Sequence, residues 1–181
     1  GFQLLLRRGV EWAATGQVSA ADVPRALAAY QYGQSRAVLR EVAGLAQAAP
    51  RALAPPLAAL LETEATPAAK QFACEQLGLI GTAAEVPALA RQLGQPDLAW
   101  AARSALERIA GDESLAALRA ALPAATGASR QGLINSLAAR RDAHSVPLLA
   151  ELLPAAADAL AAIGTAEALA ALQAARPQPT A

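Results

Sequence analysis

Residues 77–118, LGLIGTAAEVPALARQLGQPDLAWAARSALERIAGDESLAAL, contain the pattern that predicts the fold. Each half of this stretch places a second leucine twelve residues after a first one, Leu89 after Leu77 and Leu118 after Leu106. The same pair recurs along the chain as Leu45 with Leu57, Leu137 with Leu149, and Leu160 with Leu172. Self-similarity at a nearly fixed period is typical of helical repeat arrays.

Within each unit the apolar residues follow the spacing of one helix face. Ala73, Leu77 and Ile80 are spaced i, i+4, i+7, and Leu89 with Leu93 forms the inward stripe of the next helix. The following unit repeats both stripes with Ala102, Leu106, Ile109, Leu118 and Leu122. Shifts of 29 residues (77 to 106), 31 (106 to 137) and 32 (45 to 77) fit two short helices plus turns. A unit this small cannot bury its own apolar face, so stacking of neighbouring units must bury it.

Composition and charge support this interpretation and exclude several classes of function. Alanine makes up roughly three residues in ten and aromatic residues only 3%, which favours helix almost everywhere. The 15 basic and 15 acidic residues cancel, so the chain lacks the long-range positive field of a typical nucleic-acid binder. No apolar run approaches the length of a transmembrane helix, and we expect no membrane insertion. The single cysteine fits a soluble protein of either the cytoplasm or the periplasm.

Caps and prolines predict where helices begin and end. A first helix is expected from Phe2 to about Thr15, and Ser19 with Asp22 resembles a capping box for a second helix that ends near Gly33. A third helix is expected over 35–48. Thr66 before Pro67 predicts a cap and an N1 proline. We further expect Pro55 and Pro56 in the first turn of a helix, Asp97 and Asp112 as caps, and the glycines at helix ends.

The repeat segments resemble a known family. GLIGTAAEVPALARQLGQPDLAWAARSALERIAG (78–111), AHSVPLLAELL (143–153) and AIGTAEALAAL (162–172) are similar to HEAT-like repeats of the short bacterial type. This resemblance implies an all-α, right-handed α-α superhelix of about five helix pairs over residues 20–176, followed by a tail at 177–181. Lys70 and Arg130 match a basic position of the family, whereas Ala99 and Leu153 depart from it. The last unit is shortened, and Pro154 is expected to replace most of its internal turn.

A second, shorter resemblance lies at the N-terminus. RRGVEWAATGQVS (7–19) is similar to the closing stretch of trehalose-utilisation (ThuA-like) domains. It implies that residues 1–19 form an N-terminal helix at the end of a preceding domain, in a larger carbohydrate-linked bacterial protein. Because the chain begins at Gly1 and contains no methionine, we also expect it to be a fragment of a longer polypeptide.

Residues that perform chemistry are scarce. His144 is the only histidine, so a histidine pair or an H-E-x-x-H helix cannot occur. Cys74 has no histidine near it in sequence, and we interpret it as a small, partly buried filler in preference to a reactive thiol. No glycine-rich phosphate loop is present. We therefore predict a protein that is not an enzyme and that has no cofactor or metal.

The remaining candidates are surface residues on the second helix of each pair, which usually lines the concave side in HEAT-like arrays. Alignment of these helices by their leucines selects seven residues as a putative concave-face binding set: Gln71, Glu75, Trp100, Arg103, Glu107, Gln131 and Asn135. Trp100 with Arg103 is the best anchor for a partner, because exposed Trp and Arg are enriched at interface hot spots. Trp100 could equally pack between neighbouring repeats. Arg140 and Arg141 are expected to complement a helix C-terminus and not to bind phosphate.

These observations favour a non-catalytic interaction or spacer module. Its partner would be a protein, either another domain of the same polypeptide or a separate chain. The first alternative is a nucleic-acid-binding HEAT-like protein of the DNA-glycosylase type, which needs a basic groove. Two aligned positions of the second helices read Gln, Trp, Gln and Glu, Ser, Asn, so they are not basic. We therefore expect no nucleic acid as partner. The second alternative is a subunit of a lyase-like enzyme, which rests on repeat similarity alone.

Overall fold

The computed structural model describes residues 19–175, and every regular element in this range is helical. The all-α prediction is therefore confirmed for the described part of the chain. The first helix expected in the sequence, nearly all of the ThuA-like stretch and the tail at 177–181 lie outside it. In chain order the helices are η1 (Ala20–Asp22), α2 (Val23–Leu27), α3 (Ala37–Ala48), α4 (Pro50–Leu61), α5 (Pro67–Ile80), η2 (Ala83–Glu85), α6 (Val86–Gln92), α7 (Ala99–Arg108), α8 (Asp112–Ala121), α9 (Gly127–Ala139), η3 (Ala143–Ser145), α10 (Val146–Ala150), α11 (Ala157–Ile163) and α12 (Ala166–Ala174).

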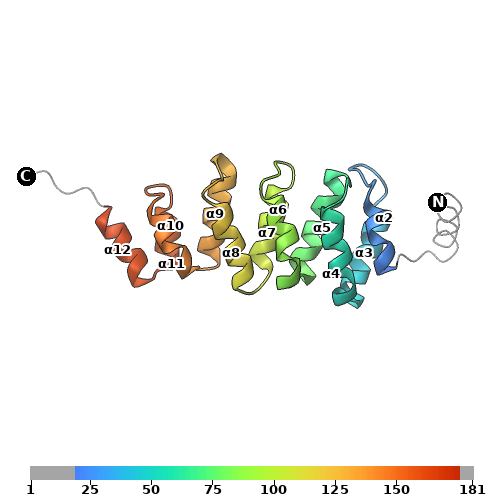
Figure 1. Cartoon of the computed structure of the whole chain (residues 1–181), viewed down its shortest axis with the longest axis horizontal. Helices are drawn as coiled ribbons and strands as arrows, with labels where there is room; N and C mark the ends of the chain where they lie inside the picture. The colour runs from blue at the N-terminus through green and yellow to red at the C-terminus, as the bar shows by residue number, and fades with distance from the viewer. Residues whose placement is uncertain (1–18, 176–181) are drawn as a thin grey trace, which may run out of the picture.

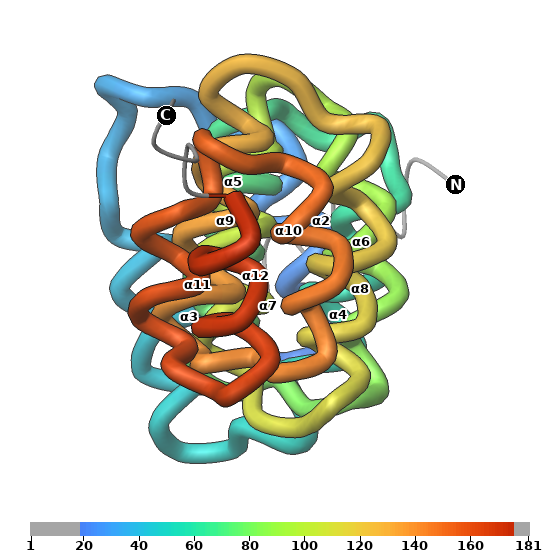
Figure 2. Tube along the Cα trace, turned by 90° about the vertical axis from the view of Figure 1, so that its left-hand side faces the viewer, coloured from blue at the N-terminus to red at the C-terminus, as the bar shows by residue number. Residues whose placement is uncertain are grey.

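The α-helices are arranged in two layers. The even-numbered helices form one layer and the odd-numbered helices the other, so the chain crosses from layer to layer at every turn. Along the array the helices follow one another in chain order (Figure 1). In one layer α4 contacts α2 and α6, and in the other α5 contacts α3 and α7. All extensive contacts between described α-helices join elements separated by at most one helix along the chain. Viewed along its length, the array consists of hairpins stacked one behind another (Figure 2).

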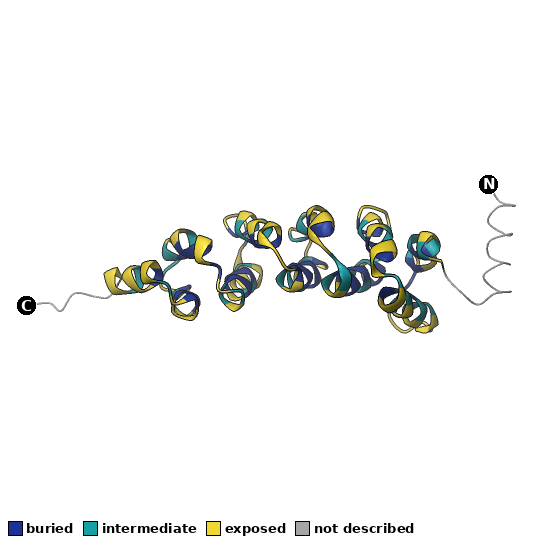
Figure 3. Cartoon of the chain, turned by 90° about the horizontal axis from the view of Figure 1, so that it is seen from below, coloured by how far each residue is buried: buried dark blue, intermediate teal, exposed yellow. Residues whose placement is uncertain are grey.

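The core is a strip between the two layers, and the leucine pairs form its centre. Figure 3 shows the buried sides of the helices turned toward the opposite layer along the whole array. Eight of the ten paired leucines are 0% exposed: Leu57, Leu77, Leu89, Leu106, Leu118, Leu137, Leu149 and Leu160. Leu45 and Leu172 are only partly buried. Leu45 is on α3 and Leu172 on α12, the helices at the two ends of their layers, which have a neighbour in the layer on one side only.

The helix starts agree with the sequence at Thr66 and differ from it at Asp97 and Asp112. The Thr66 side chain accepts a hydrogen bond from the Ala69 backbone N–H at 3.2 Å, with Pro67 at N1, as predicted. Asp97 and Asp112 are not caps. Leu98 occupies the N-cap of α7, and Asp112 is the first residue of α8, preceded by an N-cap glycine with φ 106°.

The second helix is shorter than predicted, because α2 ends at Leu27 instead of near Gly33. The carbonyl of Ala28 accepts the backbone N–H of Thr66 at 2.9 Å, and the Thr66 hydroxyl donates to the carbonyl of Tyr30. Both bonds tie the residues that follow α2 to the start of α5. The loop that follows α2 is fixed to the next hairpin instead.

Pro55 and Pro56 lie in the interior of α4 and not in its first turn, because the helix begins earlier, with Pro50 at its N-terminus. Each of these prolines lacks the N–H that would bond to the carbonyl four residues earlier. Those carbonyls belong to Arg51 and Ala52, which are exposed, so water can solvate them. The buried side of the same helix carries Leu53, Leu57 and Leu60, and its packing outweighs the lost bonds.

The last hairpin is shortened in its helices and not in its turn, contrary to the prediction for Pro154. Residues 151–156 between α10 and α11 are as many as residues 93–98 between α6 and α7. By contrast, α10 has 5 residues against 7 in α6, and α11 has 7 against 10 in α7.

Three of the described glycines, Gly44, Gly78 and Gly132, lie inside helices, which corrects the expectation that glycines mark only helix ends. Gly78 is within α5, and a Cβ placed on it would lie 3.0 Å from the Cα of Ala105 in α7. Gly132 is within α9, and a Cβ there would lie 2.8 Å from the Arg103 Nε. Gly78 therefore permits close approach of α5 to α7, and Gly132 permits close approach of α9 to α7.

The contrast between Gly44 and Gly78 gives a first prediction. Gly44 lies inside α3 with no atom near the position of a Cβ, so Gly44→Ala should stabilise the fold by about 0.5–1 kcal/mol. Gly78→Ala should give no such gain, because the new methyl group would press on the α7 backbone. Chemical denaturation of both variants measures the difference. Equal stabilisation by the two substitutions would contradict the close contact of α5 with α7.

Candidate functional site

A groove of about 290 Å³ runs between α5 and α7 on the odd-numbered layer. Its floor consists of small residues, Gly78 on α5 and Ala101 with Ala105 on α7, so the two helix backbones approach closely. Longer side chains flank this floor because residues four apart share one helix face. The walls contain Glu75, Gln76 and Leu79 from α5, and Trp100, Ser104 and Arg108 from α7.

The apolar part of the wall is solvent-exposed. Trp100 is 67% exposed and Leu79 is 66% exposed, and they are two of the four large hydrophobic residues that lie open to solvent in the described part of the chain. Trp100 therefore does not pack between neighbouring repeats, which was the alternative to a surface role. Exposed apolar side chains that gather beside a hollow, and are not scattered singly, indicate an interaction site.

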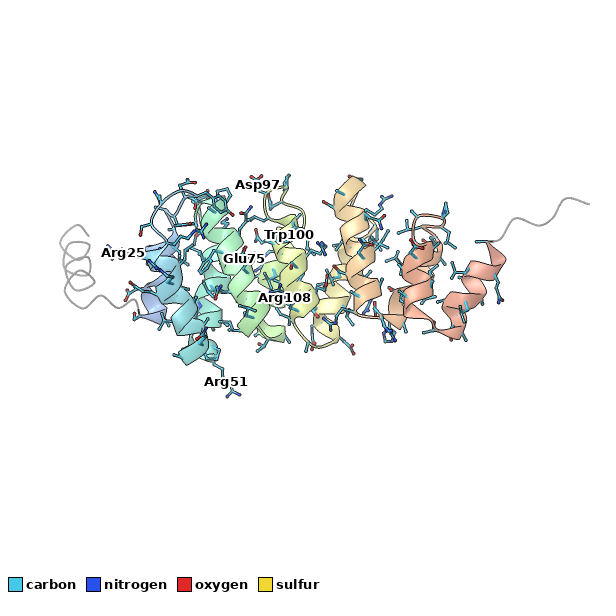
Figure 4. All side chains as sticks on the ribbon, turned by 180° about the vertical axis from the view of Figure 1, so that it is seen from behind. Arg25, Arg51, Glu75, Asp97, Trp100 and Arg108 are labelled. Carbon is cyan, nitrogen blue, oxygen red and sulfur yellow. The ribbon has the colours of Figure 1, made fainter. Side chains whose placement is uncertain are left out.

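The charged part of the wall consists of Glu75 and Arg108. Figure 4 shows both residues on the same side of the array as Trp100. Both are exposed, and neither side chain makes a hydrogen bond or an ion pair within residues 19–175. The groove thus presents one carboxylate and one guanidinium that have no partner in the described structure.

Gln71, another predicted site residue, is held by its neighbours. Its side-chain amide nitrogen donates to the carbonyl of Asp97 at 2.6 Å, and its amide oxygen accepts from the Tyr32 hydroxyl. Gln71 lies one helical turn before Glu75 on α5 and borders the groove without lining it. Its hydrogen bonds fix the loops before α3 and before α7 against α5.

Arg103 and Glu107 belong to a network between α7 and α9. Arg103 Nη1 donates to Ser136 Oγ at 2.6 Å and lies 3.3 Å from Glu107 Oε2, and Ser136 Oγ donates to that same Oε2 at 2.6 Å. The Arg103 side chain is only 18% exposed and rests against Gly132. The structure therefore separates Arg103 from Trp100. Arg103 joins two helices, whereas Trp100 faces solvent.

Gln131 and Asn135 lie on the exposed side of α9, where the Gln131 amide donates to the Asn135 carbonyl oxygen at 3.0 Å. The seven predicted residues are therefore all on α5, α7 and α9. Only Glu75 and Trp100 line the groove. Sequence reasoning missed Leu79 and Arg108, although their spacing could have revealed them: Leu79 is i+4 from Glu75, and Arg108 is i+8 from Trp100.

Arg140 complements a helix C-terminus, as expected, and the helix is α7 of the previous hairpin. Its Nη1 donates to the carbonyls of Glu107 and Ile109, each at 2.8 Å, where α7 ends. Arg141 is exposed and has a φ of 49°. The unpaired carbonyls at the end of a helix carry partial negative charge, so a guanidinium there stabilises α7.

Cys74 is completely buried on α5, more deeply than predicted. Burial, with a smaller effect of the Glu75 carboxylate, raises the pKa of its thiol from 9.0 to about 12. A thiolate is the nucleophilic form of cysteine, so this thiol is unreactive in the folded state. The interpretation of Cys74 as a packing residue is favoured.

This burial predicts slow alkylation. At neutral pH, iodoacetamide should modify Cys74 in the folded protein far more slowly than in denaturant, as measured by mass spectrometry. Because the folded pKa lies above the unfolded value, the stability contributed by this group is present below pH 9.0 and falls as the pH rises toward about 12. Alkylation of the folded and unfolded chains at equal rates would contradict the buried position.

His144 is 78% exposed in its side chain and lies 3.8 Å from the buried carboxylate of Asp142. Asp142 is paired with Arg119 of α8 at 2.6 Å. Within residues 19–175 no three His, Cys, Asp or Glu side chains converge as a metal site would require. None of the described helices has the length and apolar character needed to cross a bilayer.

The described fold is all-α, with helices stacked in two layers, and the groove between α5 and α7 is partly apolar and partly charged. Comparison with protein-family models, with curated proteins and with solved structures finds no match to this chain. The function is therefore inferred from the groove itself.

Proposed function

We propose that this chain is a HEAT-like, right-handed α-α superhelix of about five helix pairs that acts as a non-catalytic protein-interaction module. Its parent would be a larger, carbohydrate-linked bacterial protein, as the resemblance at residues 7–19 implies. The partner is a segment of another domain or protein, and it docks in the groove between α5 and α7. The in-order contacts of the helices and the two-layer arrangement support this proposal.

One observation carries the assignment of the groove. Trp100 and Leu79 both keep about two thirds of their surface exposed on either side of a floor made only of glycine and alanine. Burial of such side chains on binding removes apolar surface from water, and a tryptophan in a small pocket is a typical hot spot. The shape of the floor suits a protruding partner side chain.

Nothing in the groove favours nucleic acid. A phosphate-binding groove needs several basic side chains, whereas this groove has one acidic and one basic residue. A labelled DNA duplex should therefore show no salt-dependent mobility shift with this chain. Such a shift would favour the nucleic-acid alternative.

A displayed library of random linear peptides tests the proposed function. Selection on the wild-type chain should enrich peptides whose binding weakens about 30-fold in Trp100→Ala, as expected for loss of one hot spot. Leu79→Ser should also weaken binding. Leu169→Ser is the matched control, because Leu169 is a 50% exposed leucine on α12, outside the groove.

Two results would contradict the proposal. One is a selection that enriches no peptide on the wild-type chain. The other is a set of peptides that bind Trp100→Ala and Leu79→Ser as well as they bind the wild type. Circular dichroism and denaturation midpoints, unchanged in all three variants, exclude loss of folding as the cause of weaker binding.

A further inference from the structure

Glu75 and Trp100 form an acidic, aromatic part of the groove. The carboxylate of Glu75 is exposed and unpaired in the described structure, and it shares the groove with the exposed ring of Trp100. A carboxylate and an indole face both attract a cation, the first by charge and the second by its quadrupole. A basic side chain satisfies both groups together. An acidic side chain would be repelled by Glu75.

Arg108 makes the other part of the groove basic. It ends α7 two helical turns after Trp100, and by the alignment of the repeat leucines it is level with Leu79 on α5. A guanidinium offers paired N–H donors that match a carboxylate. This part of the groove therefore selects an acidic group, and the adjacent Leu79 side chain supplies an apolar surface beside it.

The two sides of α7 differ in how their charges are used. Toward α9, Arg103 and Glu107 are tied to each other and to Ser136. Toward α5, Arg108 and Glu75 line one groove and are not paired with each other. The charges facing α9 are used within the fold, whereas those facing α5 remain available to a partner.

We propose that the occupant of this groove is a linear protein segment that carries a basic side chain, a central aliphatic side chain and an acidic side chain. This inference rests on the proposed function and adds the chemistry of the partner. The basic side chain binds at Glu75 and Trp100, the aliphatic side chain enters over the floor of Gly78, Ala101 and Ala105, and the acidic side chain binds Arg108. The segment is thus recognised by charge complementarity at both ends.

The same peptide library, sequenced after selection, tests this charge pattern. On the wild-type chain the enriched peptides should carry a basic and an acidic residue on opposite sides of an aliphatic one. On Glu75→Gln the basic preference should weaken, because only the Trp100 ring remains to attract a cation, and the acidic preference should remain. On Arg108→Gln the acidic preference should disappear and the basic one should remain. Glu167→Gln and Arg51→Gln remove exposed charges outside the groove and should leave the pattern unchanged.

A directed measurement follows with one enriched peptide. Replacement of its basic residue by norleucine should weaken binding to the wild-type chain about fivefold, the effect of an exposed ion pair at its upper range. The same replacement should weaken binding to Glu75→Gln less, because the carboxylate partner is absent there and only the Trp100 ring attracts the cation. An equal loss on both chains would overturn the assignment of Glu75.

The outcomes separate this inference from the proposed function. Peptides that depend on Trp100 but show no charge pattern, or show acidic residues on both sides, would overturn the inference and leave the interaction module standing. A selection that yields no Trp100-dependent peptide would overturn both. Enrichment of the basic–aliphatic–acidic pattern, altered as described in the two groove variants, would support both.

Discussion

Replacement of Leu106 by alanine is expected to lower the free energy of unfolding by about 2–5 kcal/mol. Leu106 is 0% exposed and lies on α7, which packs against α5, α6, α8 and α9. Removal of its isobutyl group leaves a cavity that these helices cannot close without losing their contacts with one another. Chemical denaturation followed by circular dichroism measures the loss.

Gln131→Ala is the matched control for Leu106→Ala. Gln131 lies on α9 in the same layer and is exposed, and within the described residues its side chain bonds only to Asn135 one turn later. Its replacement should change stability by no more than about 0.5 kcal/mol. Comparable losses at Leu106 and Gln131 would contradict the assignment of buried and exposed helix faces.

Arg119→Met should have the second large effect, a loss of about 3 kcal/mol. Arg119 Nη1 lies 2.6 Å from Asp142 Oδ2, and the Asp142 side chain is only 1% exposed. Methionine keeps the apolar length of the side chain but leaves the buried carboxylate with no strong cation partner, since His144 is at 3.8 Å and largely in water. Denaturation at neutral pH measures this loss.

A double variant separates the charge effect from packing. Adding Asp142→Asn to Arg119→Met removes the buried charge, so the double variant should be more stable than Arg119→Met alone. Arg51→Met provides the exposed control on α4. If Arg119→Met cost no more than Arg51→Met, the pair between α8 and the turn after α9 would not contribute to the fold.

The sequence allowed the helical repeat and its core to be predicted from one pattern. The twelve-residue leucine pairs join the end of each odd-numbered helix to the next even-numbered helix. The connection between them varies from the single residue Ala49 to residues 140–145, yet the leucine spacing is constant. Buried side chains must meet their partners at fixed positions, so their spacing is more regular than that of the turns.

Local rules failed where tertiary contacts took precedence. Pro55 and Pro56 predict a helix start, but α4 begins earlier, at Pro50, because Leu53 and Ala54 are buried together with the following turns. The predicted end of α2 lies too late, and the residues after Leu27 are instead bonded to Thr66, 36 residues or more farther along the chain. No local pattern reports such a bond.

The candidate site was predicted in part. Alignment of the second helices located Glu75 and Trp100, because exposed positions repeat with the leucines. Leu79 was overlooked because Leu77 and Ile80 beside it are core residues, although a rotation of 100° per residue places Leu79 with Glu75. The separation of Arg103 from Trp100 depends on Gly132 and Ser136 of the next hairpin, and the spacing within α7 does not contain that information.

Pulsed electron paramagnetic resonance tests the in-order stacking of the helices most directly. Nitroxide labels are placed at positions 75, 135 and 158 in a Cys74→Ala background. These positions are exposed and equivalent, because each lies two residues before the repeat leucine of its helix, α5, α9 or α11. Packed helices lie about 8–10 Å apart, so the separation should be about 20 Å for 75 with 135 and about 30 Å for 75 with 158. A distance from 75 to 158 equal to or shorter than that from 75 to 135 would mean a closed bundle and would contradict the account.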